Sequence, residues 1–171
     1  MAKHFMVKHL GRAPARFEES QLNSWQREVA HHMPLEESER WLAAETPHDL
    51  DAERRRAFIA AIRPNVLLPA DVARWREVVF GPSPVLDEAS LARVREAGPQ
   101  FFRAAADAAA RDPSLDAIVG AVKAATGARG QALWRPLRLA LTGSPEGPEL
   151  APLLKAMPDL SIHERLERFA A

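Results

Sequence analysis

Apolar residues along this chain recur at steps of three and four positions, which is the spacing of one face of an α-helix. The clearest example lies between positions 18 and 32, where Leu22, Trp25 and Val29 fall on one stripe that continues to Met33. Acidic residues at positions 18 and 19 suit the positive N-terminal end of such a helix. We therefore expect a helix over 18–32 that turns this stripe inward.

The same pattern predicts a series of short helices, because 14 prolines and 8 glycines interrupt the apolar stripes. Besides 18–32, the predicted helices cover 2–10, 34–44, 50–62, 69–80, 87–97, 100–111, 113–126, 149–155 and 161–170. Asp49 and Asp112 are the expected N-caps of two of them, with Pro113 at the first helical position. Tyrosine is absent and β-branched residues are scarce, so we expect an all-α fold without a sheet.

A chain of 171 residues forms one domain, or two small ones that share an interface. Two stretches cannot continue a helix, namely Gly-Pro-Ser-Pro at 81–84 and Gly-Pro at 98–99. We expect an N-terminal helical subdomain over 1–97 and a C-terminal helical subdomain over 98–171, joined near one of these stretches.

Composition and charge narrow the possible functions. The 23 basic residues balance 23 acidic residues, so broad, non-specific binding to nucleic acid is not expected. The absence of cysteine excludes disulfides, cysteine-bound zinc and thiol catalysis. No run approaches the roughly 18 apolar residues of a membrane-spanning helix, and the first residues lack the features of a secretion signal, so we expect a cytoplasmic protein.

Side-chain patterns for catalysis or for a bound cofactor are missing from the sequence. The six histidines form no His-Glu-x-x-His pattern, and the adjacent His31 and His32 point apart, so no metal site is expected. Ser144 follows a glycine but lies outside the frame of a nucleophilic serine, and no glycine-rich phosphate loop occurs. We interpret the three arginines at 54–56, which follow acidic residues, as a solvated helix face, with phosphate binding as the alternative.

The most informative segment is basic and rich in glycine and proline. A stretch without acidic side chains, between positions 117 and 145, holds Lys123, Arg129, Arg135 and Arg138. Arg135 and Arg138 share a helical face at a spacing that suits two adjacent phosphate or base contacts. The loop at 143–148 then allows its backbone to approach a ligand closely. The alternative is an ordinary arginine-bearing helix followed by a tight turn.

The four tryptophans divide between the apolar stripes and this basic segment. Trp25, Trp41 and Trp75 lie on stripes and are expected as core anchors. Trp134 lies beside Arg135. We expect Trp134 to pack in the core, and the alternative is that it stacks on a nucleic-acid base.

The basic segment resembles a known family. Its residues 131–143, Gln-Ala-Leu-Trp-Arg-Pro-Leu-Arg-Leu-Ala-Leu-Thr-Gly, and 147–150, Gly-Pro-Glu-Leu, are similar to the C-terminal region of bacterial glutamyl-tRNA synthetases. In that family a Pro-Leu-Arg-x-Ala-Leu-Thr-Gly stretch lies in the anticodon-binding part. The stretches at 5–17, 22–23 and 164–168 also look like the family, so the resemblance spans nearly the whole chain and is weakest from 50 to 111.

The resemblance implies a multi-helix, cage-like anticodon-binding region in two helical subdomains. Arg138 matches the arginine of the family's Pro-Leu-Arg stretch, which contacts an anticodon base. Gly147, Pro148 and Leu150 match a loop that packs on anticodon bases. An arginine with which some members discriminate the third anticodon base falls near Asn65, and a shorter neutral side chain there puts that discrimination in doubt.

The chain also departs from the family, because no His-x-Gly-His-type and no Lys-Met-Ser-Lys-Ser-type motif occurs in it. The chain alone is therefore not expected to catalyse ligation, and no cofactor is expected. The resemblance implies that it binds the anticodon arm of a glutamate-accepting tRNA and orients it for a catalytic half, as a piece or a relative of a glutamate–tRNA ligase. The alternatives are a stand-alone interaction module that binds a protein such as a synthetase, and a helical domain with another ligand.

Overall fold

The computed structural model describes residues 18–171, and within that range the chain forms ten α-helices, two short 3-10 helices and no strand. The predicted all-α fold is confirmed for this part of the chain. The predicted helix at 2–10 and the family-like stretch at 5–17 lie outside the described residues. The helices are α1 (Glu19–His32), α2 (Leu35–Leu42), α3 (Ala52–Ile62), η3 (Arg63–Asn65), η4 (Pro69–Asp71), α4 (Val72–Phe80), α5 (Glu88–Ala97), α6 (Pro99–Ala109), α7 (Leu115–Thr126), α8 (Gln131–Thr142), α9 (Leu150–Ala156) and α10 (Asp159–Glu167).

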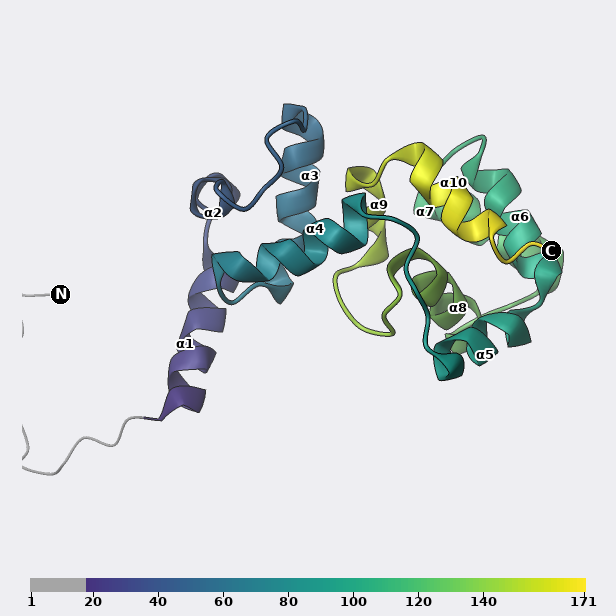
Figure 1. The fold of residues 1–171 in the computed structure, drawn as a ribbon, viewed down its shortest axis with the longest axis horizontal. Helices are drawn as coiled ribbons and strands as arrows, with labels where there is room; N and C mark the ends of the chain where they lie inside the picture. Colours follow the sequence, from purple (N-terminus) through teal and green to yellow (C-terminus); the bar gives the residue numbers. More distant parts are fainter. Residues whose placement is uncertain (1–17) are drawn as a thin grey trace, which may run out of the picture.

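The helices form an elongated arrangement, with α1 to α4 toward one end, α5 to α8 and α10 toward the other, and α9 between them (Figure 1). In the second group, α6 packs on both α7 and α10, and α5 packs on α8. The late helix α9 returns to the first group and packs on α3. The expected division at residues 97 and 98 falls between α5 and α6, two helices in contact, and it stays a prediction.

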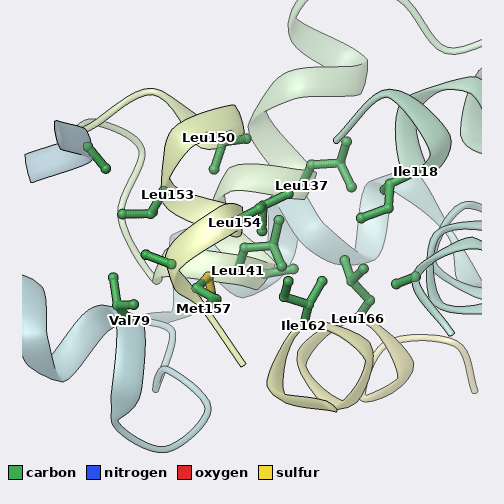
Figure 2. Packing of buried hydrophobic residues seen from close by; sticks show 14 of the residues in the cluster. Val79, Ile118, Leu137, Leu141, Leu150, Leu153, Leu154, Met157, Ile162 and Leu166 are labelled. Atoms are coloured by element: carbon green, nitrogen blue, oxygen red, sulfur yellow. The ribbon is translucent and has the colours of Figure 1, made fainter. Parts of the chain in front are cut away.

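One cluster of buried apolar side chains extends through both groups of helices, from Leu42 to Leu166. Figure 2 shows its centre, where leucines of α8 and α9 meet Ile162 and Leu166 of α10. Because these side chains are removed from water, their burial supplies the main favourable term for folding. The cluster thereby fixes α8, the helix that carries the family-like arginines, between α5, α7 and α10.

Arg165 of α10 is a buried arginine, with 1% of its surface exposed. Its Nη1 donates to the carbonyls of Val78 and Leu141, each at 2.6 Å, and its Nη2 donates to the carbonyl of Gly81 at 2.8 Å. The carbonyls of Val78 and Leu141 belong to the last turns of α4 and α8. Carbonyls in the last turn of a helix lack hydrogen-bond donors within that helix. Burial lowers the pKa of this guanidinium, and the charge of Glu77 opposes that shift. The C-terminal dipoles of both helices favour a cation at this point.

The connection at 81–84 is held from two more sides. Arg168 donates to the carbonyl of Pro84 at 2.7 Å. Gly143, which ends α8 at φ 71°, lies so close that a Cβ there would meet the Pro84 Cβ at 2.7 Å. The glycine- and proline-rich stretch between the two groups of helices is therefore fixed in place by α8 and α10.

Two expected N-caps are wrong. Asp51, not Asp49, caps α3 by accepting a hydrogen bond from the Arg54 amide at 2.7 Å. Ser114, not Asp112, caps α7, and Asp112 instead accepts from the amide of Ser114 at 2.9 Å. In both cases a second capping residue two positions later lies closer to the apolar stripe. Pro113 consequently lies before α7 and not at its first position.

The expected inward stripe of α1 is also wrong, because Leu22, Trp25 and Val29 are 47%, 61% and 58% exposed. The helix packs through the adjoining face, where Ala30 is buried and Gln26 donates to the carbonyl of Leu67 at 3.0 Å. Trp25 is therefore not a core anchor in the described part of the chain. Trp75 is buried and Trp41 is half-buried, in line with their stripes.

The arginines at 54–56 behave as a helix face with local partners. Arg56 pairs with Glu36 at 2.9 Å, Arg55 donates to the carbonyl of Leu50 at 2.9 Å, and Arg54 lies 3.7 Å from Asp159. These contacts favour the structural interpretation of the three arginines over phosphate binding.

Replacing Arg165 with methionine is expected to lower the free energy of unfolding by at least about 3 kcal/mol, because it leaves several buried carbonyls without donors. Arg168→Met is the matched control, since Arg168 is exposed and donates to one carbonyl, and it should cost no more than about 1 kcal/mol. Urea unfolding of the two variants measures both values. Equal losses would show that the buried arginine does not hold the helices together.

Candidate nucleic-acid interface

The helix α8 presents the family-like arginines on a rigid support. It begins after Gly130 at φ 53° and ends at Gly143 at φ 71°, two backbone conformations that favour glycine. Between them most of its apolar side chains are buried, and the inward positions include Leu133, Leu137 and Leu141. Arg135 and Arg138 therefore have fixed positions, which direct contacts with a ligand require.

Arg138 is partly buried and uses only one side of its guanidinium within the described chain. Its Nη2 donates to the carbonyl of Pro148 at 2.9 Å, whereas its buried Nη1 has no partner among the described residues. Burial lowers the pKa of this guanidinium, yet an arginine remains a cation at neutral pH. A buried donor without an acceptor is costly, so an acceptor that reaches Nη1 after a shift of the loop at Gly147 would be favoured.

The loop at 143–149 is closed on itself by short-range hydrogen bonds. The hydroxyl of Thr142 donates to the carbonyl of Arg138 at 2.8 Å and accepts from the amide of Ser144 at 3.3 Å. The amide of Glu146 donates to the hydroxyl of Ser144 at 3.4 Å. The loop therefore has a defined shape next to Arg138, although residues 145–147 are exposed.

Gly147 lies against the ring of Trp75 from α4. Its backbone has a φ of 140°, which residues other than glycine rarely adopt. A Cβ at this position would also lie 2.8 Å from Cη2 of Trp75 and 3.8 Å from Nη1 of Arg138. A side chain at 147 would thus displace the loop from the tryptophan. The requirement for glycine at this point comes from a contact with a residue far away in the sequence.

Trp75 also connects Asn65 to this site. Its indole Nε1 donates to the backbone carbonyl of Asn65 at 3.5 Å, and the guanidinium of Arg74 lies 4.9 Å from the centre of its ring. The structure therefore brings four of the expected site residues to one place: Asn65, Arg138, Gly147 and Pro148. Asn65 and Gly147 are exposed, Arg138 is partly buried and Pro148 is buried.

The other two expected site residues lie elsewhere. Leu150 is 5% exposed and belongs to the apolar cluster, as Figure 2 shows. Arg135 is exposed and lines a groove of about 370 Å³ between α5 and α8, with Arg93 and Glu96 on the opposite side. The common helical face of Arg135 and Arg138 thus does not bring their side chains to one contact point.

Sequence reasoning missed three residues around these sites. Trp75 was expected in the core, and its second role as the support of the loop has no sequence signal. Arg74 could be recognised only from its position next to Trp75, and Arg93 belongs to no sequence motif. Trp134 was expected to pack in the core, but it is 43% exposed, so this expectation is wrong and a stacking surface beside Arg135 remains available.

Neither a metal-binding cluster nor a membrane-spanning helix occurs in the described part of the chain. Among residues 18–171 no three or more histidines, aspartates or glutamates gather in a way that holds a metal ion. Within the same range, no helix combines the length and the apolar character needed to cross a membrane. The groups that the site does present are guanidinium and backbone hydrogen-bonding groups, with aromatic surface nearby.

Replacing Gly147 with alanine is expected to lower the free energy of unfolding by about 1–3 kcal/mol, because the new Cβ collides with Trp75. Gly127→Ala is the matched control. Gly127 has φ 69° but no atom within 4 Å of the place that a Cβ would take, so backbone strain alone should cost about 1 kcal/mol. Urea unfolding followed by tryptophan fluorescence distinguishes them. A smaller loss at 147 than at 127 would contradict the proposed packing on Trp75.

Comparison with known proteins places these features in context. No protein-family model matches the chain. The chain is 42% identical over 170 residues to the protein named Glutamate--tRNA ligase 2 of Nitrosococcus oceani, and the matched region makes up 98% of this chain and 36% of that protein. It is 43% identical over 169 residues to Glutamate--tRNA ligase 2 of Alkalilimnicola ehrlichii, covering 98% and 35% respectively. The chain thus spans about a third of the length of these relatives.

Solved structures share the fold. The glutamate-tRNA synthetase from Elizabethkingia anophelis superposes with a TM-score of 0.76 at 18% identity, over 97% of this chain and 34% of that one. A glutamate tRNA ligase from Elizabethkingia meningosepticum, in complex with its amino acid, gives a TM-score of 0.78 at 18% identity, over 97% and 35%. At this identity the likeness concerns the arrangement of the helices.

Proposed function

Because this chain corresponds to a C-terminal part of the glutamate–tRNA ligases, we propose that it binds the anticodon arm of a glutamate-accepting tRNA. In this proposal it orients the tRNA, in the cytoplasm, for catalytic residues that this chain does not contain. The observation that carries the proposal is the gathering of Arg138, Gly147 and Asn65 around Trp75.

The position of Arg138 suits the reading of a base. The hydrogen bond to the carbonyl of Pro148 fixes the orientation of the guanidinium, so its second nitrogen has a defined direction. An unstacked base presents acceptor atoms on its edges, and proteins read single-stranded RNA through such atoms. A fixed arginine can therefore select among bases, whereas a mobile surface arginine adds mainly charge.

The loop beside Arg138 supplies the surface for such a base. Gly147 adds no side chain, so a ligand can approach the backbone at this exposed position. Pro148 and Leu150 are buried and give the loop its shape from below, which limits their part in our proposal to support. Asn65 belongs to the same site because its backbone carbonyl accepts a hydrogen bond from Trp75. We propose that the neutral side-chain amide of Asn65 contacts a neighbouring base.

Arg135 has a different part in this proposal. It lies in the groove beside α5, near Arg93 and the exposed Trp134. An exposed arginine in such a groove suits contact with the RNA backbone, which positions the molecule but does not identify bases. The zero net charge of the chain means that a few such local contacts, and not a broad positive surface, must attract the tRNA.

Arg138→Ala is expected to weaken binding to tRNA with a glutamate anticodon by about 1–3 kcal/mol, the cost of losing a base contact. Arg138→Lys keeps the charge but loses the planar fork, so it should also lose selectivity. Filter binding or fluorescence anisotropy of the isolated chain measures the affinities, and circular dichroism confirms folding. Equal losses with a swapped anticodon would mean that Arg138 contacts only phosphate. The absence of any RNA binding at low salt, where attraction is strongest, would refute the proposal for this chain.

Arg135→Ala is expected to weaken binding to all tested tRNAs by a similar factor, and to reduce the slope of log affinity against log salt by about 1. Arg111→Ala is the control, because Arg111 is an exposed arginine after the end of α6 and does not line the groove. A loss that depends on the anticodon would instead assign Arg135 to base reading.

A further inference from the structure

The indole of Trp134 is a feature of α8 to which the proposed site gives no role. Trp134 is 43% exposed, whereas Leu133 and Leu137 of the same helix are 1% and 0% exposed. Within the described residues it is the only large apolar side chain of α8 that is exposed. Single exposed apolar side chains are common on protein surfaces, so exposure alone does not indicate a ligand. The position of Trp134 relative to Arg138 is what indicates one.

Trp134 and Arg138 are neighbours on the surface of α8. They are four residues apart, and side chains at this spacing in a helix have Cβ atoms about 5–6 Å apart. Each residue of a helix turns by about 100°, so Arg138 falls between Trp134 on one flank and Arg135 on the other. An RNA strand that crosses α8 at Arg138 therefore meets an aromatic ring on one flank and a cation on the other.

The approach to Trp134 is open at the beginning of α8. The amide of Trp134 donates to the carbonyl of Gly130 at 3.0 Å, so the connection before α8 ends one turn before the indole. A Cβ at Gly127 or at Gly130 would have no atom within 4 Å, which shows free space around this connection. Arg129 is exposed, and no acidic residue occurs between positions 117 and 145. A polyanion can therefore reach the ring without meeting a negative side chain of this segment.

We propose that Trp134 is a stacking platform for a second unpaired base of the RNA, next to the base at Arg138. The inference deepens the function proposed above and rests on it. Every base has a π-face, so stacking on an aromatic ring adds affinity without selecting among bases. Arg138 then reads the identity of one base, and Trp134 holds the adjoining nucleotide one helical turn away. Partial burial suits this role, because the covered part of the indole fixes the ring while the exposed part receives the base.

Trp134→Leu removes the ring but keeps an apolar side chain for the covered side. It is expected to weaken binding of the anticodon-arm RNA by about 5- to 100-fold, the effect of losing one base–aromatic stack. Trp134→Phe keeps a ring and should retain most of the affinity. The slope of log affinity against log salt should not change in either variant, because stacking releases no counterions. Fluorescence anisotropy with labelled RNA measures these values, and circular dichroism confirms folding.

Trp25→Leu is the matched control for this measurement. Trp25 is 61% exposed and lies on α1, toward the other end of the molecule (Figure 1). Its replacement should leave the affinity for RNA unchanged. Unchanged affinity in Trp134→Leu, or equal losses with leucine and with phenylalanine at this position, would overturn the proposal.

Abasic substitutions in the RNA give a second measurement, which leaves the protein unchanged. At one unpaired position next to the base read by Arg138, removal of the base should weaken binding by the same factor as Trp134→Leu. The same abasic RNA should show no further loss with Trp134→Leu, because effects on two partners of one contact are not additive. Additive losses at every unpaired position would overturn the stacking.

The outcomes for Trp134 and for Arg138 are distinguishable. A loss in Trp134→Leu without any dependence on Arg138 or on the anticodon would support the stacking and refute base reading. Dependence on Arg138 with unchanged affinity in Trp134→Leu would do the reverse. Absence of RNA binding by the unchanged chain would overturn both.

Discussion

The contact of one buried guanidinium with the ends of two helices holds this structure together. Arg165 reaches the carbonyls of Val78 and Leu141 and that of Gly81 beyond α4. Helix ends leave carbonyls without partners, and when two such ends are buried side by side only a donor with several N–H groups satisfies them together. The arginine thereby fixes α4, which carries Trp75, relative to α8, which carries Arg138. The candidate site lies between these two helices and depends on their relative position.

The site itself follows from that relative position. With α4 and α8 fixed, Trp75 faces the loop after α8, and Gly147 allows the loop to lie on the indole ring. The loop in turn presents the carbonyl of Pro148 to Arg138, which leaves the other guanidinium nitrogen without a protein acceptor among the described residues. Each residue in this series has a structural partner on one side. The recognition that we propose uses the remaining groups, and no separate binding element is needed.

The helices were predictable because their signals are local, as the apolar spacing of α7 shows. The caps were displaced by two residues, since Asp49 and Asp51, or Asp112 and Ser114, are equally good candidates before the structure is known. Periodicity states which residues share a face but not whether a neighbour covers that face, which is why the stripe with Trp25 was assigned inward. The link between Asn65 and Arg138 depends on Trp75 at long range, and spacing holds no information on it. The resemblance indicated four residues of this site without the tryptophan that joins them.

The packing of α9 on α3 has a consequence for the order in which the chain acquires its structure. Helix α3, whose buried side chains include Phe58 and Ile62, packs on α2 and on α9, and α9 is synthesised only near the end of the chain. Contacts between distant segments form late, and apolar side chains that wait for them are exposed to other molecules in the meantime. On a ribosome the first group of helices therefore remains incomplete until α9 has emerged. A chain that ends before α9 leaves this surface open, which makes it a substrate for chaperones and not a smaller version of the folded protein.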